Sequence, residues 1–233
     1  IQIGTELAVI LYFRHDIINI LTHWFSCLFG KNGPDWRARM GRGDKYATLG
    51  WNVIVGSIPI IILGFTLQNI IETSLRNLWI TVTVLFLFGL LLWIVDARSR
   101  QIKTMDDMNY RDAFLFGLGQ SMALIPGVSR SGMTITTGCF VGFERKFAVR
   151  FSFLLSIPAV LGANILSLKD ALTGGVDWSQ LPVYLAGVVV AAVSGYLCIR
   201  LLKMIADKGR FGAFAYYCWA AGLLTVILTL VGT

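Results

Sequence analysis

The sequence predicts an all-α, polytopic integral membrane protein, and three observations lead to that prediction. The 233 residues are 56% hydrophobic and 14% charged, whereas roughly a quarter of the residues of a soluble domain are charged. The mean hydropathy is +0.70. Uncharged segments recur along the chain, each close to or above the roughly 18–20 residues that cross the hydrocarbon of a bilayer. They are residues 46–67, 77–95, 151–168, 181–199 and 211–231.

The chain opens within a further apolar segment. Residues 1–13 read IQIGTELAVILYF and contain most of another span. The sequence begins on Ile1, with neither Met nor a signal-peptide pattern, and we expect a preceding N-terminal piece to be missing. Glu6 is the lone acid of this segment; it can line a cavity or lie at the outer surface, and we favour the surface. Because no soluble domain or long linker is evident, we expect residues 1–233 to form a single transmembrane domain.

Basic residues orient the predicted spans. Two linking segments hold a single basic residue each, Arg76 in 68–76 and Lys169 in 169–180. Four others each carry at least three, namely 31–45, 96–112, 144–150 and 200–210. The positive-inside rule places these four in the cytoplasm and the other two outside, so that the C-terminus lies outside. The net charge of +7 then favours contact with anionic lipid headgroups over binding of nucleic acid.

The segment between two of the cytoplasmic loops indicates a re-entrant helical hairpin over residues 113–143. Its flanking loops, 96–112 and 144–150, are both basic and expected on the same side, so the chain between them must enter and return. The apolar pieces on either side of its turn are each too short to span. A tip at residues 126–132, near membrane depth, satisfies both observations and predicts a watery cavity. The alternative is a pair of short spans joined by an ordinary loop.

Two weaker patterns and the cysteines complete the survey. Residues 17–29 place large apolar side chains on one face at helical spacing, which predicts a helix lying in the membrane interface. The triplet SIP at 57–59 recurs at 156–158 and is consistent with an internal repeat. The four cysteines lack metal-type spacing, and we interpret them as small buried side chains. They are Cys27, Cys139, Cys198 and Cys218.

Arg130 stands between two serines in the otherwise apolar stretch ALIPGVSRSGMT, residues 123–134. A charged side chain within a membrane is costly to bury and faces a partner, a cavity or a ligand. The nearest acids in sequence are Asp112 and Glu144, so a structural salt bridge would need a carboxylate from elsewhere. The other interpretation is an anion site, because a guanidinium presents a rigid fork that binds two phosphate oxygens at once.

The neighbours of this arginine have the properties of a phosphate site. Ser129 and Ser131 add hydroxyl donors, and Gly127 and Gly132 let the backbone approach a ligand closely. Pro126 ends the preceding helix. The next helix would begin near Ser131, and its free N–H groups and positive dipole end also favour an anion.

Three polar residues upstream of the tip have open or ordinary interpretations. Gln120 either hydrogen-bonds to another helix or points into the cavity, and the sequence does not choose between them. Asp106 and Asp107 resemble a metal-binding pair but are better explained as caps of the incoming arm.

At PGVSRSGMT, residues 126–134, the chain resembles the bacterial undecaprenyl-diphosphatase family, also known as bacitracin-resistance proteins. The similarity continues in DDMNYRDAF before this motif and in RFSFLLSIPAV, residues 150–160, after it. It includes the opening IQIGTELAV and IVGSIPIIILG at 54–64, and it covers essentially the whole chain.

The resemblance implies a fold and an activity. The fold would be an inverted repeat with two re-entrant hairpins, of which this chain holds one. The activity would be that of a multi-pass phosphatase of the bacterial cytoplasmic membrane. It would remove the terminal phosphate of undecaprenyl diphosphate, which recycles the lipid carrier for peptidoglycan synthesis, with help from a divalent cation, Mg²⁺ or Ca²⁺.

The resemblance also implies roles for residues. Arg130 would grip the diphosphate, with Ser129 and Ser131 beside it as the catalytic group. The substrate-binding group would be Gly127, Gly132, Thr134 and Gln120.

One departure from the family pattern concerns the catalytic machinery. The family's first hairpin carries a glutamate-rich motif and a Ser-Ser-Thr-Gly-His turn, which supply metal-binding carboxylates, a candidate nucleophile and a catalytic His. Neither His15 nor His23 matches that turn, and we expect no metal ligand in this chain. Phosphoryl transfer needs an activated attacker as well as charge clamping, so we expect these 233 residues alone to be inactive.

Two other functions are kept as alternatives. A transporter or flippase for a phosphorylated lipid suits re-entrant hairpins in an inverted repeat, because an Arg–Ser anion site can bind without hydrolysing. A membrane scaffold with a purely structural Arg130 is the third. Membrane lipids are the expected partners in every case.

Overall fold

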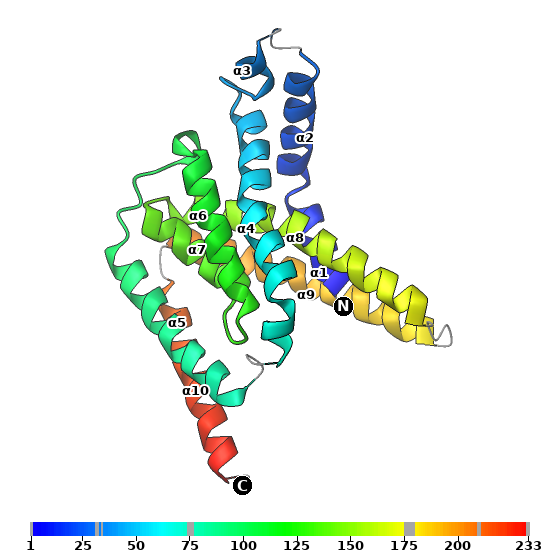
Figure 1. Ribbon diagram of the computed structural model, residues 1–233. Helices are drawn as coiled ribbons and strands as arrows, with labels where there is room; N and C mark the ends of the chain where they lie inside the picture. The colour runs from blue at the N-terminus through cyan, green and yellow to red at the C-terminus, as the bar shows by residue number, and fades with distance from the viewer. Residues whose placement is uncertain are drawn as a thin grey trace. The chain divides into compact units, whose positions relative to one another are not determined.

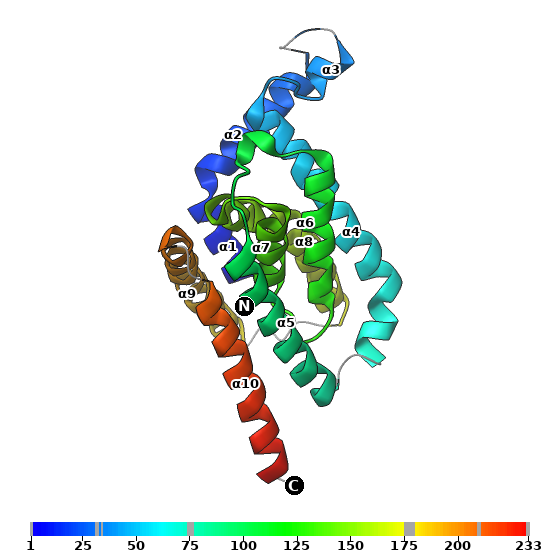
Figure 2. The same cartoon turned by 90° about the vertical axis from the view of Figure 1, so that its left-hand side faces the viewer.

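The computed structural model describes residues 2–30, 33, 35–73, 77–174, 180–208 and 211–231. Within these residues the chain is a succession of helices (Figures 1 and 2), which confirms the all-α fold class. A parallel bridge between Lys103 and Phe143 is the one isolated β-type pairing that the described part of the chain contains. The helices are α1 (Gln2–Tyr12), α2 (Arg14–Leu28), α3 (Trp36–Arg39), α4 (Lys45–Thr73), α5 (Leu78–Arg98), η1 (Met105–Asp107), α6 (Tyr110–Ser121), η2 (Met122–Leu124), α7 (Arg130–Val141), α8 (Arg145–Gly174), α9 (Leu181–Lys208) and α10 (Gly212–Val231).

Five of the described helices are long and apolar enough to cross a membrane. They are α4 over Lys45–Leu67, α5, α8 over Arg145–Ile165, α9 and α10. At 11 residues, α1 is too short to span on its own. Pro59 and Pro158 lie inside α4 and α8, and each lacks the N–H that would bond to the carbonyl four residues back. Of the basic residues that oriented the spans, Lys31, Arg76 and Arg210 lie outside the described residues, as does the side chain of Lys169.

The chain forms two compact units. Unit 1 contains Ile1–Trp51 and Phe153–Met204, and unit 2 contains Asn52–Ser152 and Ile205–Thr233. The helices α4, α8 and α9 each contribute residues to both units, and the single transmembrane domain expected from the sequence stays a prediction.

In unit 1, α1 packs on α9, and α2 packs on the first turns of α4. A side chain at Gly4 would collide with the backbone carbonyl of Val188, so glycine permits the close approach of α1 to α9. The ring of Trp24 on α2 lies edge-on to that of Trp51, with centroids 5.3 Å apart. The helix expected over residues 17–29 is therefore present as α2, and its position in the membrane interface stays a prediction. Glu6 is only 4% exposed, so the surface position that we favoured for it is wrong.

In unit 2, α5 and α10 run antiparallel and side by side (Figures 1 and 2). The indole N–H of Trp219 on α10 donates to the carbonyl of Phe86 on α5 at 3.2 Å. The buried aromatic rings of this unit gather where α6, α7 and α8 meet, at Phe116, Phe143, Phe147 and Phe151.

Three of the four cysteines are buried, but Cys198 is exposed, so the buried interpretation is wrong for that residue.

Candidate functional site

The segment expected to form a hairpin folds as two packed helices joined by a turn. Helix α6 descends to Ser121, η2 follows, and α7 returns from Arg130 to Val141. The two arms pack against each other, and a side chain at Gly119 would collide with Thr137 of the returning arm. Gly142 ends α7 with a left-handed φ of 102°. That the hairpin enters and leaves on one face of a membrane stays a prediction.

The tip of the hairpin is shaped by Gly127. This residue adopts φ +96°, a conformation that side chains other than glycine rarely take. A Cβ atom built there would lie 2.9 Å from the backbone carbonyl oxygen of Thr81 on α5. The turn therefore rests directly on the α5 backbone, and glycine is required there by conformation and by space.

The N-terminus of α7 is capped by Ser129. Its Oγ accepts a hydrogen bond from the N–H of Gly132 at 3.2 Å, and its carbonyl accepts the N–H of Met133 at 2.8 Å. The first N–H groups of an α-helix have no intrahelical acceptor, and those of Arg130 and Ser131 occupy these positions. Arg130 is the first residue of α7, so a guanidinium and the positive end of the helix dipole originate at the same point.

Thr134 and Gly132 have local contacts that the sequence did not indicate. Thr134 is fully buried, and its hydroxyl donates to the carbonyl of Arg130 at 2.7 Å. Its O–H therefore binds the backbone of the residue that opens the helix. A Cβ at Gly132 would lie 2.7 Å from the ring of Phe88 on α5, so this glycine lets α5 approach α7.

The seven candidate residues divide between the two arms. Ser129, Arg130, Ser131, Gly132 and Thr134 share the first turns of α7 or its cap, and Gly127 is in the adjoining turn. Gln120 lies on α6, in the opposite arm, and is fully buried. Ser129 is exposed, whereas Arg130 and Ser131 are half-buried. A ligand at the α7 N-terminus would thus meet the serine and the arginine first.

The base of the hairpin is held by the backbone and side chain of residues 102–103, which we call the strap and which sequence reasoning missed. Lys103 Nζ pairs with both carboxylate oxygens of Asp112 at 3.2 Å, and it also lies 5.2 Å from the ring centroid of Phe143. The backbone N–H groups of Ile102 and Lys103 both donate to the carbonyl of Gly142 at 2.9 Å. The strap thereby joins the start of α6 to the end of α7.

The contacts of Asp112 and Asp107 bear on two interpretations made from the sequence. One is a salt bridge between Arg130 and a nearby acid, and the other is a cap of the incoming arm by an aspartate. Asp112, one of the two acids nearest to Arg130 in sequence, is bound at the hairpin base by Lys103 and by Asn109, whose Nδ2 donates at 2.8 Å. Asp107 accepts the Thr104 N–H at 2.8 Å in the capping box of η1. The incoming arm α6 is capped instead by Asn109, whose Oδ1 accepts the N–H groups of Arg111 and Asp112 at 3.0 Å, so the interpretation of the two aspartates as caps of that arm is wrong. The N–H and hydroxyl of Thr104 lower the pKa of the Asp107 carboxyl.

A second connection below the hairpin joins three helices of unit 2. Arg145, the first residue of α8, donates from Nε and Nη2 to Asp96 Oδ1 at 3.0 and 2.7 Å. The other oxygen of Asp96 accepts the N–H of Gly212 at 2.9 Å and so satisfies the first turn of α10. A lone acid at the end of an apolar span was the available sequence signal for this connection.

The residues described do not supply a complete metal site. Nowhere in the described ranges do three or more His, Cys, Asp or Glu side chains gather closely enough to hold a metal ion. The candidate site at α7 consists of hydroxyl, guanidinium and amide groups, which are suited to bind an anion directly.

The fold and this site define a class: a polytopic α-helical membrane protein with an arginine at the start of a hairpin helix. Residues 1–224 match the family model described as bacitracin resistance protein BacA. The chain belongs to this family, which confirms the resemblance seen in its motifs.

Curated relatives cover the whole chain. An undecaprenyl-diphosphatase of Bifidobacterium longum (strain DJO10A) is 64% identical over 235 residues, which span 100% of this chain and 80% of the relative. The undecaprenyl-diphosphatase of Bifidobacterium adolescentis is 50% identical over 240 residues, spanning 100% of the chain and 81% of the relative. That of Corynebacterium efficiens is 42% identical over 233 residues, spanning 100% and 76%.

Proposed function

We propose that this protein hydrolyses undecaprenyl diphosphate to undecaprenyl phosphate and phosphate. The main support is the family match over residues 1–224, together with 64% identity to an undecaprenyl-diphosphatase. The protein is then a hydrolase that acts on a phosphoric anhydride of a membrane lipid. Its product is the lipid carrier of peptidoglycan synthesis, so the activity bears on cell-wall biogenesis, cell shape and bacitracin resistance. The comparisons do not support the alternative of a flippase.

The catalytic part of the proposal rests on the start of α7. The Arg130 guanidinium and the first-turn N–H groups of the helix favour a diphosphate at this point. Arg130 would clamp oxygens of the terminal phosphate and stabilise the charge that develops as the anhydride P–O bond breaks. Ser129 and Ser131 would donate hydroxyl hydrogen bonds to the same group.

The substrate-binding part of the proposal assigns mainly positioning roles. Gly127 and Gly132 would hold the tip against α5, since both approach that helix closely. Thr134 would orient Arg130 through its 2.7 Å bond to the Arg130 carbonyl. Gln120 would act from the opposite arm of the hairpin.

A divalent cation and the location of the enzyme are further parts of the proposal. Mg²⁺ or Ca²⁺ is expected from the family, and loss of activity on adding a chelator would support it. We place the enzyme in the bacterial cytoplasmic membrane with its C-terminus outside, on the distribution of basic residues. That these 233 residues alone are inactive stays a prediction.

Phosphate release from undecaprenyl diphosphate by the purified full-length protein tests the assignment. Arg130→Ala should lower kcat/KM by about 10²–10³-fold, which is typical for removing a group that stabilises transition-state charge. Arg130→Lys should recover part of the rate, because it keeps the charge and loses the fork. Arg111→Ala is the matched control, since Arg111 is an exposed arginine at the other end of the same hairpin. An unchanged rate in Arg130→Ala, or an equal loss in the control, would refute the role of Arg130.

A further inference from the structure

A basic segment lies between α2 and the span in α4. Arg37, Arg39 and Arg42 are all exposed. Within the described residues, none of the three forms an ion pair with a carboxylate. Together with Trp36 they form what we call the basic loop patch.

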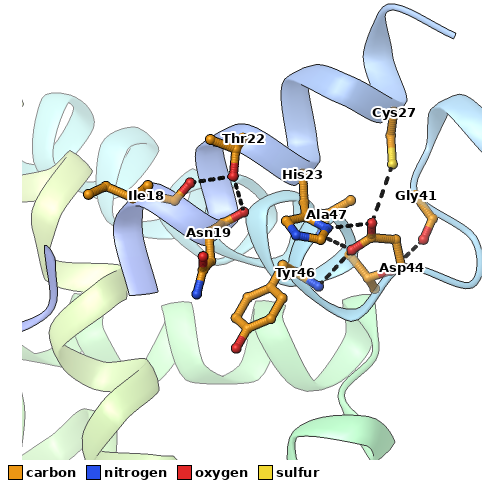
Figure 3. Close-up of polar contacts among 10 residues, drawn as sticks. Ile18, Asn19, Thr22, His23, Cys27, Gly41, Asp44, Tyr46 and Ala47 are labelled. Atoms are coloured by element: carbon orange, nitrogen blue, oxygen red, sulfur yellow. Dashed lines mark hydrogen bonds and ion pairs between the residues drawn. The ribbon is translucent and has the colours of Figure 1, made fainter. Parts of the chain in front are cut away.

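Asp44, two residues after Arg42, links α2 to the start of α4 (Figure 3). Asp44 Oδ1 accepts the N–H groups of Tyr46 and Ala47 at 3.0 and 3.1 Å and so caps α4. Its Oδ2 lies 2.7 Å from Nδ1 of His23 on α2. The hydroxyl of Thr48 also donates to the carbonyl of Gly41 at 2.9 Å. The arginines are therefore carried on a turn with a defined shape.

Aromatic side chains accompany the cations. Trp36 is 66% exposed, and the guanidinium carbon of Arg37 lies 5.5 Å from the centroid of its ring. Phe29, at the end of α2, is 82% exposed. Exposed indoles beside basic side chains are typical of the membrane–water interface, where the ring lies at headgroup level and the charge reaches outward.

The position and charge of the patch identify its partner. Helix α4 is long and apolar enough to span a membrane from Lys45, and this start directly after the patch would place the patch at the membrane surface. Between residues 35 and 43 its three arginines are accompanied by one acid, Asp35. A guanidinium fork matches the phosphate oxygens of a lipid headgroup. A soluble polyanion would leave Trp36 and Phe29 exposed, whereas a lipid would contact both.

We propose that the basic loop patch binds the headgroup of an anionic phospholipid, such as phosphatidylglycerol, in the leaflet where α4 begins. Arg37, Arg39 and Arg42 bind the headgroup phosphate, and Trp36 contacts the glycerol region beneath it. This site serves the lipid that surrounds the protein, and it does not depend on the proposed hydrolase activity.

Native mass spectrometry of the full-length protein tests the proposal. The protein is released from micelles that contain equal amounts of phosphatidylglycerol and phosphatidylcholine, and the ratio of the two retained lipids is measured. The triple variant Arg37→Gln, Arg39→Gln, Arg42→Gln should lower this ratio on the order of tenfold, since each basic residue near a membrane surface adds to anionic-lipid attraction. A ratio that the triple variant leaves unchanged would overturn the proposal.

A matched control separates a local site from overall charge. The variant Arg98→Gln, Arg100→Gln, Arg111→Gln removes the same charge from exposed positions of another basic segment. It should retain phosphatidylglycerol as the unchanged protein does. An equal loss in this control would mean that net charge, and not the patch, attracts the lipid, and the proposed site would be rejected.

Two further measurements distinguish lipid from free phosphate and guard against misfolding. Excess inorganic phosphate should leave the retained phosphatidylglycerol in place, because the lipid also contacts Trp36; displacement by phosphate would count against a lipid site. In vesicles, brominated phosphatidylglycerol should quench tryptophan fluorescence more than brominated phosphatidylcholine does. That difference should diminish in Trp36→Phe, and its persistence would also overturn the proposal.

Discussion

At the residue scale, Asp44 joins two helices with one carboxylate. Burial raises the pKa of this carboxyl, but the hydrogen bonds with His23 and with the backbone N–H groups of Ala47 and Tyr46 outweigh burial, so the pKa is lower than usual. A lowered folded-state pKa means that the ionised form stabilises the fold. This stabilisation is present above the unfolded-state pKa and is lost as the pH falls through the folded-state value.

We therefore predict that the connection made by Asp44 weakens below about pH 4, the ordinary range for an aspartate. Asp44→Ala should destabilise the first turn of α4 by about 1 kcal/mol, as the loss of a helix cap does. Hydrogen exchange of the Tyr46 and Ala47 amides measures this, and the difference between variant and unchanged protein should shrink as the pH falls. Asp44→Asn is the control, because its amide oxygen can still cap the helix. A pH-independent difference would contradict the prediction.

At the scale of elements, the hairpin depends on contacts at its base as much as on its tip. The strap through Lys103 joins α6 to α7, and the Arg145–Asp96 pair joins α5, α8 and α10. Both side chains of that pair are largely buried. Removing one member leaves the other as an uncompensated charge, which is strongly destabilising in a buried pair.

We predict that Arg145→Ala lowers the free energy of unfolding of the detergent-solubilised protein by about 3 kcal/mol. Thermal unfolding should show a clear fall in Tm. The matched control is Lys146→Ala, because Lys146 pairs with Asp207 at 3.4 Å and both side chains are exposed. An exposed pair contributes about 0–1 kcal/mol, so the control should change little. If both substitutions lowered the free energy of unfolding equally, loss of the Arg145–Asp96 contact would not explain the effect of Arg145→Ala.

At the scale of the whole molecule, membrane topology follows from the distribution of charge over the linking segments. Five helices that are long and apolar enough to span, with one hairpin expected to return to its own side, predict that α4 begins in the cytoplasm and that α10 ends outside.

Labelling of single cysteines tests this topology. In a background with the four native cysteines replaced by alanine, an impermeant maleimide added to intact cells should label Gln180→Cys but neither Arg42→Cys nor Arg100→Cys. Inverted vesicles should give the reverse pattern. Labelling of Arg100→Cys from outside would rule out the proposed orientation of the hairpin.

The long apolar helices and the two hairpin helices could be predicted because they depend on local properties. An uncharged run of sufficient length prefers hydrocarbon wherever it occurs. The sequence analysis assigned Ser129 only to the ligand and expected the helix to begin near Ser131, so it missed that Ser129 caps a helix beginning at Arg130. The family motif at residues 126–134 is likewise a local pattern, and the comparisons confirm the family that it indicated.

The sequence by itself therefore determined the class of protein, its all-α fold and its family. Only the tertiary structure decided that Glu6 is buried, that Cys198 is exposed, and that Arg145 pairs with Asp96 from 49 positions away. It also decided that Thr134 binds the Arg130 carbonyl. The reason is that burial and long-range pairing depend on which helix faces meet after packing, whereas hydrophobic length and capping act within a few residues.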